Sequence, residues 1–430
     1  KTTVFKAQLR ILPSVAFISA FLNNTPVVVI FAPIIKHWAK SVKLPATKFL
    51  IPLSYVTILG GICTLIGTST NLVVHGMILE AGYEGFTMFE LGKVGIFIAI
   101  AGIIYLFIFS KRLLPDARPD TAVPDEEVEE GEKLHRVEAV LGARFPGINK
   151  KLSDFNFQRH YGAEVKEIKT RNGQRYVDHL EDVVLREGDT LVVMADDTFI
   201  PTWGESSVFV LLTNGNEPDT TGKKKRWFAL LLLVLMIVGA TVGELPVTKE
   251  MFPDIKLDMF FFVSITTIIM AWTNLFPARK YTKYISWDIL ITIACAFAIS
   301  KAMVNSGVAD SVAKFIIGLS DDYGPHVLLA MVFIITNLFT ELITNNAAAA
   351  LAFPLALSIS AQLGVSPTPF FVVICMAASA SFSTPIGYQT NLIVQGIGNY
   401  KFTDFVRIGL PLNIITFLIS VILIPLIWNF

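Results

Sequence analysis

Long apolar stretches alternate with short polar breaks along most of this 430-residue chain. Six of the stretches predict helices that cross a lipid bilayer, because about 20 apolar residues span its hydrocarbon core. These six are Val94–Phe109, Trp227–Gly243, Met259–Phe276, Ile289–Val304, Val327–Phe339 and Ile408–Trp428. The pattern therefore predicts an α-helical polytopic membrane protein.

Two further apolar segments carry polar residues in their middle. The segment 6–39 is broken at Asn23–Pro26, and the segment 51–74 is broken at Gly67–Asn71. Since a proline disfavours helix for the residue before it, we expect Thr25 to be non-helical. Each segment is predicted to form two short helices that meet at polar residues.

These polar breaks occur twice, in the same order. The first copy reads Leu22-Asn-Asn-Thr-Pro26, then Gly67-Thr-Ser-Thr-Asn-Leu-Val-Val-His-Gly76, then Phe86-Thr-x-Phe89. The second reads Ile343-Thr-Asn-Asn-Ala347, then Gly387-Tyr-Gln-Thr-Asn-Leu-Ile-Val-Gln-Gly396, then Phe402-Thr-x-Phe405. Three matching blocks in one order rarely arise by chance, so we predict an internal repeat.

Composition divides the chain into four parts. Residues 1–115 are predicted as the first membrane repeat and residues 223–430 as the second. Residues 116–132 are acidic and predicted as a solvated linker, whereas residues 133–222 are polar with strand-like alternation and predict a small α+β domain. Because far more membrane-type sequence precedes the second motif than the first, we expect about three N-terminal spans to be missing from this chain.

Basic residues predict the orientation of the chain. Lys111-Arg112 and Lys223–Arg226 flank the polar domain, which places that domain in the cytoplasm by the positive-inside rule. The intervening loop of the second repeat, Val247–Asp258, should then be external. We expect a multi-pass protein of the cell membrane, specifically a bacterial inner membrane, in contact with membrane lipid.

Composition excludes several classes of protein. The chain is 53% hydrophobic and 16% charged, with a mean hydropathy of +0.60, which is too apolar for a soluble globular chain. Its net charge of zero shows no basic excess for nucleic acid. No nucleophile–base constellation, phosphate loop or zinc-ligand spacing is present in the sequence, so we expect no enzyme activity.

Broken helices in an internal repeat are a common way to build a transport site. The N-termini of half-helices and side-chain amides face an anion, while carbonyl and side-chain oxygens hold a cation. Asn and Thr side chains suit both tasks. Since neither motif contains Lys or Arg, an anion would be held by amides and hydroxyls, and co-bound cations would balance its charge.

Two other features near the motifs bear on this hypothesis. A hydroxyl precedes each motif by four residues, at Ser19 and at Thr340, and it either shares a site with the motif asparagine or bonds its own backbone. Glu341 is the acid beside the second motif, and its counterpart in the first copy is Ala20. We therefore expect Glu341 to stabilise the hinge rather than to couple an ion.

The two motifs, Asn23-Asn24-Thr25 and Thr344-Asn345-Asn346, resemble the paired Ser-Asn-Thr motifs of the divalent anion/sodium symporter family, within the ion transporter superfamily. The polar domain resembles a TrkA-C (RCK C-terminal) domain through Asn156-Phe-x-x-x-Tyr-Gly-Ala-Glu-Val and Leu185-x-x-Gly-Asp-x-Leu. Together these features resemble the sulfate-permease-like branch of the family, which carries TrkA-C domains between the two membrane halves.

The resemblance implies two inverted repeats with re-entrant hairpins and broken helices, a homodimer, and elevator-type alternating access. It implies sodium ions at Ser19, Asn23, Asn24, Thr68, Asn71, Thr340, Thr344, Asn345, Thr384 and Asn391. It implies contacts to the substrate from Asn24, Thr25, Ser69, Thr70, Asn345, Asn346, Gln389 and Thr390. The TrkA-C-like domain would either sense a small-molecule regulator or serve in dimerisation.

The motifs depart from the family pattern at two positions. Asn23 stands where the family usually has Ser, and Asn346 stands where it has Thr. The last motif position touches carboxylates in dicarboxylate carriers of the family, and an amide there suits sulfate at least as well. We therefore expect a sodium-coupled sulfate symporter.

Two alternatives stay open at this point. A carrier of dicarboxylates or other oxyanions could use the same fold. A protein of another class, an RCK-regulated potassium channel or uptake subunit, is less favoured because the sequence contains no Thr-Val-Gly-Tyr-Gly filter loop.

Overall fold

A computed structural model describes most of the chain. The described residues are 3–116, 134–142, 144–170, 174–196, 199–203, 208–213, 223–243, 246–251, 257, 259–273, 275, 287–319 and 324–430. The predicted acidic linker at residues 116–132 lies outside this part of the chain except for Asp116, and so does half of the predicted external loop.

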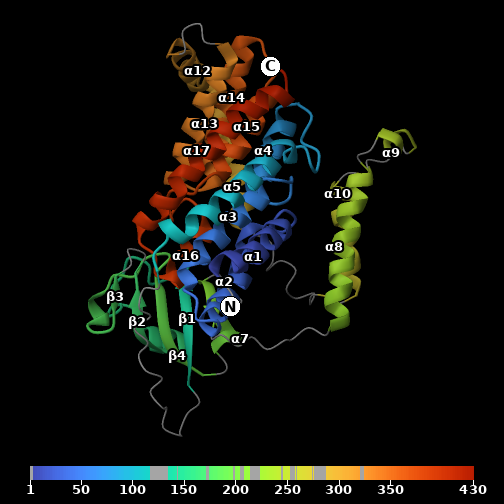
Figure 1. The fold of residues 1–430 in the computed structure, drawn as a ribbon. Helices are drawn as coiled ribbons and strands as arrows, with labels where there is room; N and C mark the ends of the chain where they lie inside the picture. The colour runs from blue at the N-terminus through green and yellow to red at the C-terminus, as the bar shows by residue number, and fades with distance from the viewer. Residues whose placement is uncertain are drawn as a thin grey trace.

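The first membrane half contains the helices α1 (Val4–Ser19), α2 (Asn24–Ser41), α3 (Leu50–Gly61), α4 (Ser69–Glu80) and α5 (Gly92–Leu113), with a 3₁₀ turn at Ala46–Lys48 (Figure 1). Both predicted interruptions are confirmed, since α1 is separated from α2, and α3 from α4, at the polar breaks. Thr25 was predicted to be non-helical and lies in the first turn of α2. Pro26 is tolerated there because the N–H groups of the first turn have no acceptor within the helix.

The second membrane half follows the polar domain. Its helices are α8 (Lys223–Gly243), α9 (Pro246–Met251), α10 (Met259–Trp272), α11 (Trp287–Asn305), α12 (Val308–Leu319), α13 (Gly324–Leu342), α14 (Asn345–Leu363), α15 (Thr368–Ser379), α16 (Gln389–Gly398) and α17 (Phe402–Ile427). Helices α14 and α16 begin at the second copies of the two polar breaks, as the repeat predicts.

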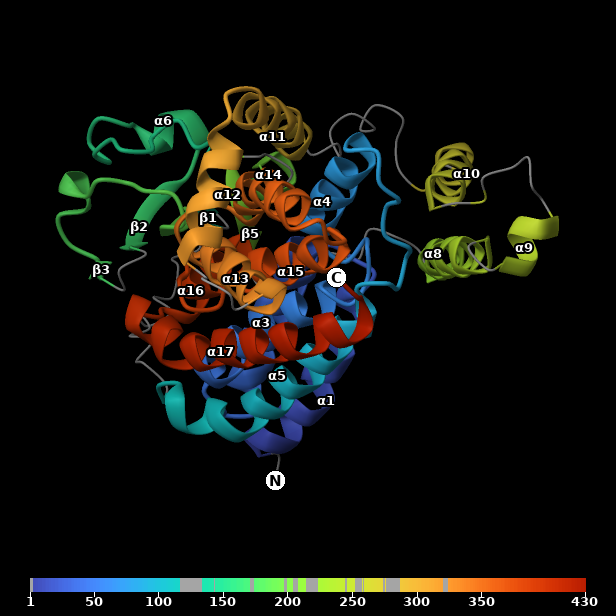
Figure 2. The ribbon, with the colours of Figure 1, turned by 90° about the horizontal axis from the view of Figure 1, so that it is seen from above.

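All six predicted spans coincide with helices. Among the described residues, α5, α13, α14 and α17 are long and apolar enough to cross a membrane, and α11 with α12 forms a bent pair that together meets the same test. The apolar part of α8, Trp227–Gly243, and helix α10 are each shorter than a full span within the described residues. They lie apart from the other helices in both views (Figures 1 and 2).

The centre of the helical bundle is formed by α3 and α15 (Figure 2). All twelve residues of α3 are buried, and α15 is buried from Pro369 to Ser379. A helix that is apolar on every side is expected at such a central position. The polar breaks that follow these two helices therefore lie inside the protein, where their polar groups need internal partners.

Between the two membrane halves, residues 135–213 form an α+β domain. Its strands are β1 (His135–Leu141), β2 (Glu164–Lys169), β3 (Arg175–Tyr176), β4 (Thr190–Ala195) and β5 (Phe209–Thr213), with short helices α6 (Phe157–Tyr161), α7 (Phe199–Trp203) and a 3₁₀ turn at Leu180–Asp182. The strands pair antiparallel in the order β3-β2-β4-β1-β5. Phe145, Tyr161 and Phe209 pack in its core. The strand-like alternation seen in this part of the sequence corresponds to strands, and the mixture of short helices and strands agrees with the predicted α+β domain.

Candidate transport site

The helices α2, α4, α14 and α16 all begin at a polar break of the repeat. Their first residues meet at one pocket of about 430 Å³. The pocket is lined by Asn23, Thr25, Ser69, Thr70, Glu187, Thr292, Leu342, Ile343, Thr344, Asn345, Asn346, Ile386, Gly387, Tyr388, Gln389 and Leu392. Because the first N–H groups of a helix lack intrahelical acceptors and carry a partial positive charge, helix N-termini around a pocket favour an anion.

The hydroxyl that precedes each motif contacts the motif asparagine. Ser19 Oγ donates to Asn24 Oδ1 at 2.8 Å, and Thr340 Oγ1 donates to Asn345 Oδ1 at 2.9 Å. Asn24 is buried, and Asn345 is buried at the pocket wall. In both halves the hydroxyl therefore bonds the side chain of the motif asparagine, and Thr340 Oγ1 also donates to the Ala378 backbone oxygen at 2.5 Å.

A second pair of asparagines forms matching hydrogen bonds to the backbone at the helix interruptions of the two halves. Asn71 Nδ2 donates to the backbone oxygens of Thr64, at 2.9 Å, and Gly61, at 3.4 Å. Asn391 Nδ2 donates to the backbone oxygens of Thr384, at 3.1 Å, and Ser381, at 2.9 Å. The internal repeat therefore extends from the sequence to individual hydrogen bonds.

The oxygens around Asn24 fit a small cation. A Cβ atom added at Gly61 would lie 2.6 Å from Asn24 Oδ1 and 3.0 Å from the Gly67 backbone oxygen, so these oxygens surround a narrow space. Asn71 Oδ1 is buried and has no hydrogen-bond partner in the described part of the chain. Hard cations take oxygen ligands, and an unpartnered buried oxygen is costly without one. The residues of the first half therefore fit a sodium ion.

The second half holds a related but different set of groups. The position of Gly61 is taken by Ser381, whose Oγ donates to the Thr340 backbone oxygen at 3.3 Å. Thr384 Oγ1 donates to the Glu341 backbone oxygen at 2.9 Å. Nearby on α15, Ser379 Oγ is buried without a partner among the described residues. This half also offers oxygens to a cation, with hydroxyls in place of the open glycine.

The two halves meet at Tyr388, a residue that the sequence analysis did not select. Asn24 Nδ2 donates to the Tyr388 hydroxyl at 2.6 Å, and Thr68 Oγ1 lies 3.1 Å from the same hydroxyl. The side chain of Asn345 also interacts with it. The repeat carried a signal for this residue, because Tyr388 occupies the position of Thr68 in the second copy.

The predicted site residues fall into two groups. Those that line the pocket are Asn23, Thr25, Ser69, Thr70, Thr344, Asn345, Asn346 and Gln389. Those that lie behind its wall are Ser19, Asn24, Thr68, Asn71, Thr340, Thr384, Thr390 and Asn391. Asn24 and Thr390 were expected to touch substrate but belong to the second group, since Asn24 binds Tyr388 and Thr390 accepts from Ser54 Oγ at 2.8 Å.

The side-chain amides of Asn346 and Gln389 can donate hydrogen bonds to a ligand in the pocket. Asn346 Oδ1 accepts from Ser69 Oγ at 3.3 Å and from Thr70 Oγ1 at 3.2 Å, across the two halves. Gln389 Oε1 accepts from Thr25 Oγ1 at 3.3 Å. With their oxygens engaged, the nitrogens of Asn346 and Gln389 are donors at the pocket wall.

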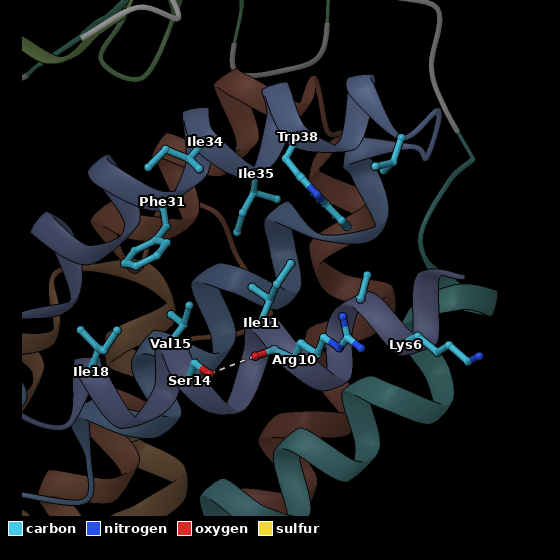
Figure 3. A pocket seen from close by; sticks show the side chains of 12 residues that line it. Lys6, Arg10, Ile11, Ser14, Val15, Ile18, Phe31, Ile34, Ile35 and Trp38 are labelled. Carbon is cyan, nitrogen blue, oxygen red and sulfur yellow. Dashed lines mark hydrogen bonds between the residues drawn. The ribbon is translucent and has the colours of Figure 1, made fainter. Parts of the chain in front are cut away.

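A larger cavity of about 850 Å³ lies between α1 and α2, away from both motifs (Figure 3). Most of its lining is apolar and includes Phe31, Ile34 and Trp38, with Lys6 and Arg10 toward one end. Its hydroxyl, Ser14 Oγ, donates to the backbone oxygen of Arg10 at 3.0 Å. This cavity presents few polar groups to a solute, so the motif pocket is the candidate transport site.

A polytopic helical bundle with a polar pocket at the meeting point of four helix ends defines a membrane transporter. The chain belongs to the citrate transporter family (CitMHS), whose sequence pattern matches residues 4–364 and 250–430.

Several similar proteins are named as transporters. The chain is 29% identical over 497 aligned positions to an uncharacterized transporter of Synechocystis sp., covering 96% of this chain and 81% of the relative. It is 25% identical to an uncharacterized transporter of Escherichia coli, covering 99% of this chain and 85% of that relative. It is 31% identical to sodium/sulfate cotransporter 2 of Chlamydomonas reinhardtii, covering 65% of this chain and 31% of that relative.

Proposed function

We propose that this protein is a sodium-coupled symporter of a divalent oxyanion, with sulfate as the expected substrate. Sodium and sulfate are named for the Chlamydomonas relative, which is 31% identical over 65% of this chain. The transport residues are those of the motif pocket, with cations bound behind its wall and the anion in front of it.

The observation that carries the proposal is the pairing of a donor-rich pocket with two sets of buried oxygens. The pocket has the amides of Asn346 and Gln389 and four helix N-termini, but no Lys or Arg among its described lining residues. A divalent anion there lacks a fixed counter-charge, whereas sodium ions beside Asn24 and Asn345 would supply it. Coupling follows because each ligand improves the affinity for the other.

Radiolabelled sulfate uptake into proteoliposomes tests the proposal. Uptake should require an inward sodium gradient, should fail when potassium replaces sodium, and should be blocked by excess unlabelled sulfate but not by succinate. Sodium-independent uptake would contradict the coupling. If neither sulfate nor another oxyanion enters and potassium moves instead, the proposal fails as a whole.

A carboxylate substrate is the second candidate. It is favoured by the volume of the pocket, about 430 Å³, which leaves room for a solute larger than sulfate, and by the family to which the chain belongs. Labelled citrate and succinate under the same sodium gradient separate the two candidates, because the transported anion is the one whose uptake saturates and accumulates.

The mode of transport is part of the same proposal. We infer inverted repeats, elevator-type movement and a homodimer from the resemblance to divalent anion/sodium symporters, with the TrkA-C-like domain in the cytoplasm. The matched hydrogen bonds at Asn71 and Asn391 support two related halves around one site. Cross-linking in native membranes at two protein concentrations tests the dimer.

A further inference from the structure

The α+β domain reaches the motif pocket through the turn that leads into β4. Arg186 N donates to Asp189 Oδ2 at 2.7 Å, Gly188 N donates to the Leu141 backbone oxygen at 2.9 Å, and Leu141 N donates to the Asp189 backbone oxygen at 2.8 Å. Gly188 has φ +83°, which residues with a side chain rarely adopt. The turn is therefore firmly attached to β1.

This turn packs against α16, beneath which the domain lies in Figure 1. A Cβ atom added at Gly188 would lie 3.1 Å from Leu392 Cδ2. One added at Gly396 would contact Thr190 Oγ1 and lie 3.8 Å from Thr190 Cβ. Since α16 begins at Gln389, the helix that supports the turn is the one whose first residue lines the pocket.

Glu187 immediately precedes Gly188 in this turn and is itself a lining residue of the pocket. It is half-buried, and it carries the charge in a lining that otherwise consists, among the described residues, of amides, hydroxyls and apolar groups. Helix N-termini attract a carboxylate for the same reason that they attract a free anion. The same carboxylate repels a divalent anion in the pocket.

We propose that Glu187 is a built-in competitor of the transported anion. While the turn is docked on α16, its carboxylate lowers the affinity of the pocket for the anion; when the domain withdraws, the affinity rises. The domain is also held to α2 by the ion pair of Lys36 Nζ with Glu138, at 3.1 Å, so its position is coupled to two helices of the site. This inference rests on the proposed function.

The first test is the charge-neutral variant Glu187→Gln. In sodium-driven sulfate uptake, its KM should fall about fivefold or more with Vmax kept, a coupling of the usual size between two ligands. The matched control is Glu181→Gln, an exposed carboxylate of the same domain that does not line the motif pocket. An unchanged or higher KM in Glu187→Gln overturns the inference.

The second test locks the turn with a disulfide. The 3.8 Å between Thr190 Cβ and a Cβ at position 396 matches the usual spacing in disulfides, so the pair Thr190→Cys and Gly396→Cys should cross-link on oxidation. The oxidised protein should show at least a fivefold higher KM than the same protein after reduction, whereas the two single-cysteine variants should not respond. Absence of the cross-link in peptide mass spectra, or a cross-link without effect on KM, overturns the inference.

Binding measurements separate this inference from the proposed function. Calorimetric titration of sulfate in sodium, with wild type and Glu187→Gln in detergent, repeats the comparison without transport. If wild type transports sulfate and both proteins bind it equally, only the inference fails. If wild type neither binds nor transports any oxyanion, the proposed function fails, and the inference fails with it.

Discussion

The first and second membrane halves use one hydrogen-bonded framework with different side chains. Asn71 and Asn391 donate to equivalent backbone oxygens, and Ser19 and Thr340 donate to equivalent asparagines. The halves differ where Gly61 is matched by Ser381 and where Ala20 is matched by Glu341.

The carboxylate has partners that are specific to the second half. Glu341 Oε1 accepts from Ser383 N at 2.8 Å and from Asn413 Nδ2 at 2.7 Å, which ties α13 to the break after α15 and to α17. Glu341 Oε2 is buried without a partner in the described residues. The repeat therefore preserves the hydrogen bonds from Asn71 and Asn391 to the backbone of the broken helices. The charge and the volume of the neighbouring side chains differ between the halves.

The largest effect is expected from removing the motif asparagines that both halves share. Asn24→Ala leaves the Ser19 hydroxyl without its acceptor, whereas Asn345→Ala removes one of the two acceptors of the Thr340 hydroxyl, the other being the Ala378 backbone oxygen. Each substitution also removes one contact to the Tyr388 hydroxyl. Each unpaired buried group costs about 1–3 kcal/mol, and we expect sodium-driven uptake to fall by at least about tenfold, with half-saturation by sodium shifted upward. Normal uptake by Asn345→Ala, at normal expression, would show that the site assignment is wrong.

Glu341→Ala gives the second half the residue that the first half has. It leaves Ser383 N without its acceptor and removes one of the two acceptors of the Asn413 amide, so the free energy of unfolding should fall by about 2 kcal/mol. Thermal unfolding in detergent measures this loss. The variant Glu341→Gln keeps an oxygen for both donors and should retain most of the stability; if it is stable but does not transport, Glu341 couples an ion and our expectation of a structural role is wrong.

Alanine at the Gly61 and Ser381 positions should act very differently in the two halves. At Gly61 the new methyl group would lie 2.6 Å from Asn24 Oδ1, so Asn24 must move. We expect about a tenfold loss of apparent sodium affinity, or about 1.4 kcal/mol. Ser381→Ala loses only the 3.3 Å bond to Thr340 and should change sodium affinity by about twofold or less. Equal effects in sodium titrations of uptake would contradict the assigned difference.

The smallest effect concerns the ion pair between the α+β domain and α2. Burial would raise the pKa of Glu138, but the ammonium groups of Lys36 and Lys169 outweigh burial and lower its pKa to about 2, from an ordinary value of 4.5. Because the pKa is lower in the folded state, the stabilisation is complete above about pH 4.5 and is lost as the pH falls toward about 2.

Lys36→Met should therefore lower the melting temperature by about 2 °C at pH 7 and flatten its fall between pH 5 and pH 3.5. The matched control is Lys166→Met, which removes an exposed pair with Glu164 and should leave both values unchanged. An identical acid profile for wild type and Lys36→Met would refute the stabilising role of this ion pair.

Hydrophobic pattern and repetition together predicted the elements that carry the site. The breaks at Asn23–Pro26 and Gly67–Asn71, and their second copies, are visible because polar residues and glycines interrupt otherwise apolar segments. The spacing of Ser19 left two roles open, and the structure has the contact with Asn24. The helical state of Thr25 was predicted wrongly, because the position of Pro26 within the first turn outweighs its usual effect.

Residues that reach the pocket from distant parts of the chain could not be predicted from the sequence pattern. Tyr388 and Ser54 bind motif residues more than 300 positions away, and Glu187 enters the pocket from another domain. Likewise, packing placed Asn24 and Thr390 behind the pocket wall rather than in it.

The sequence by itself determined the membrane class, the broken helices and their two-fold repetition, since periodicity and polarity act through neighbouring residues. The tertiary structure alone decided which amides face the pocket, which oxygens stay buried for a cation, and that a carboxylate of the α+β domain lies at the site. Those outcomes depend on how helix ends and a docked turn pack together in space, and nothing in the local pattern of residues encodes such distances.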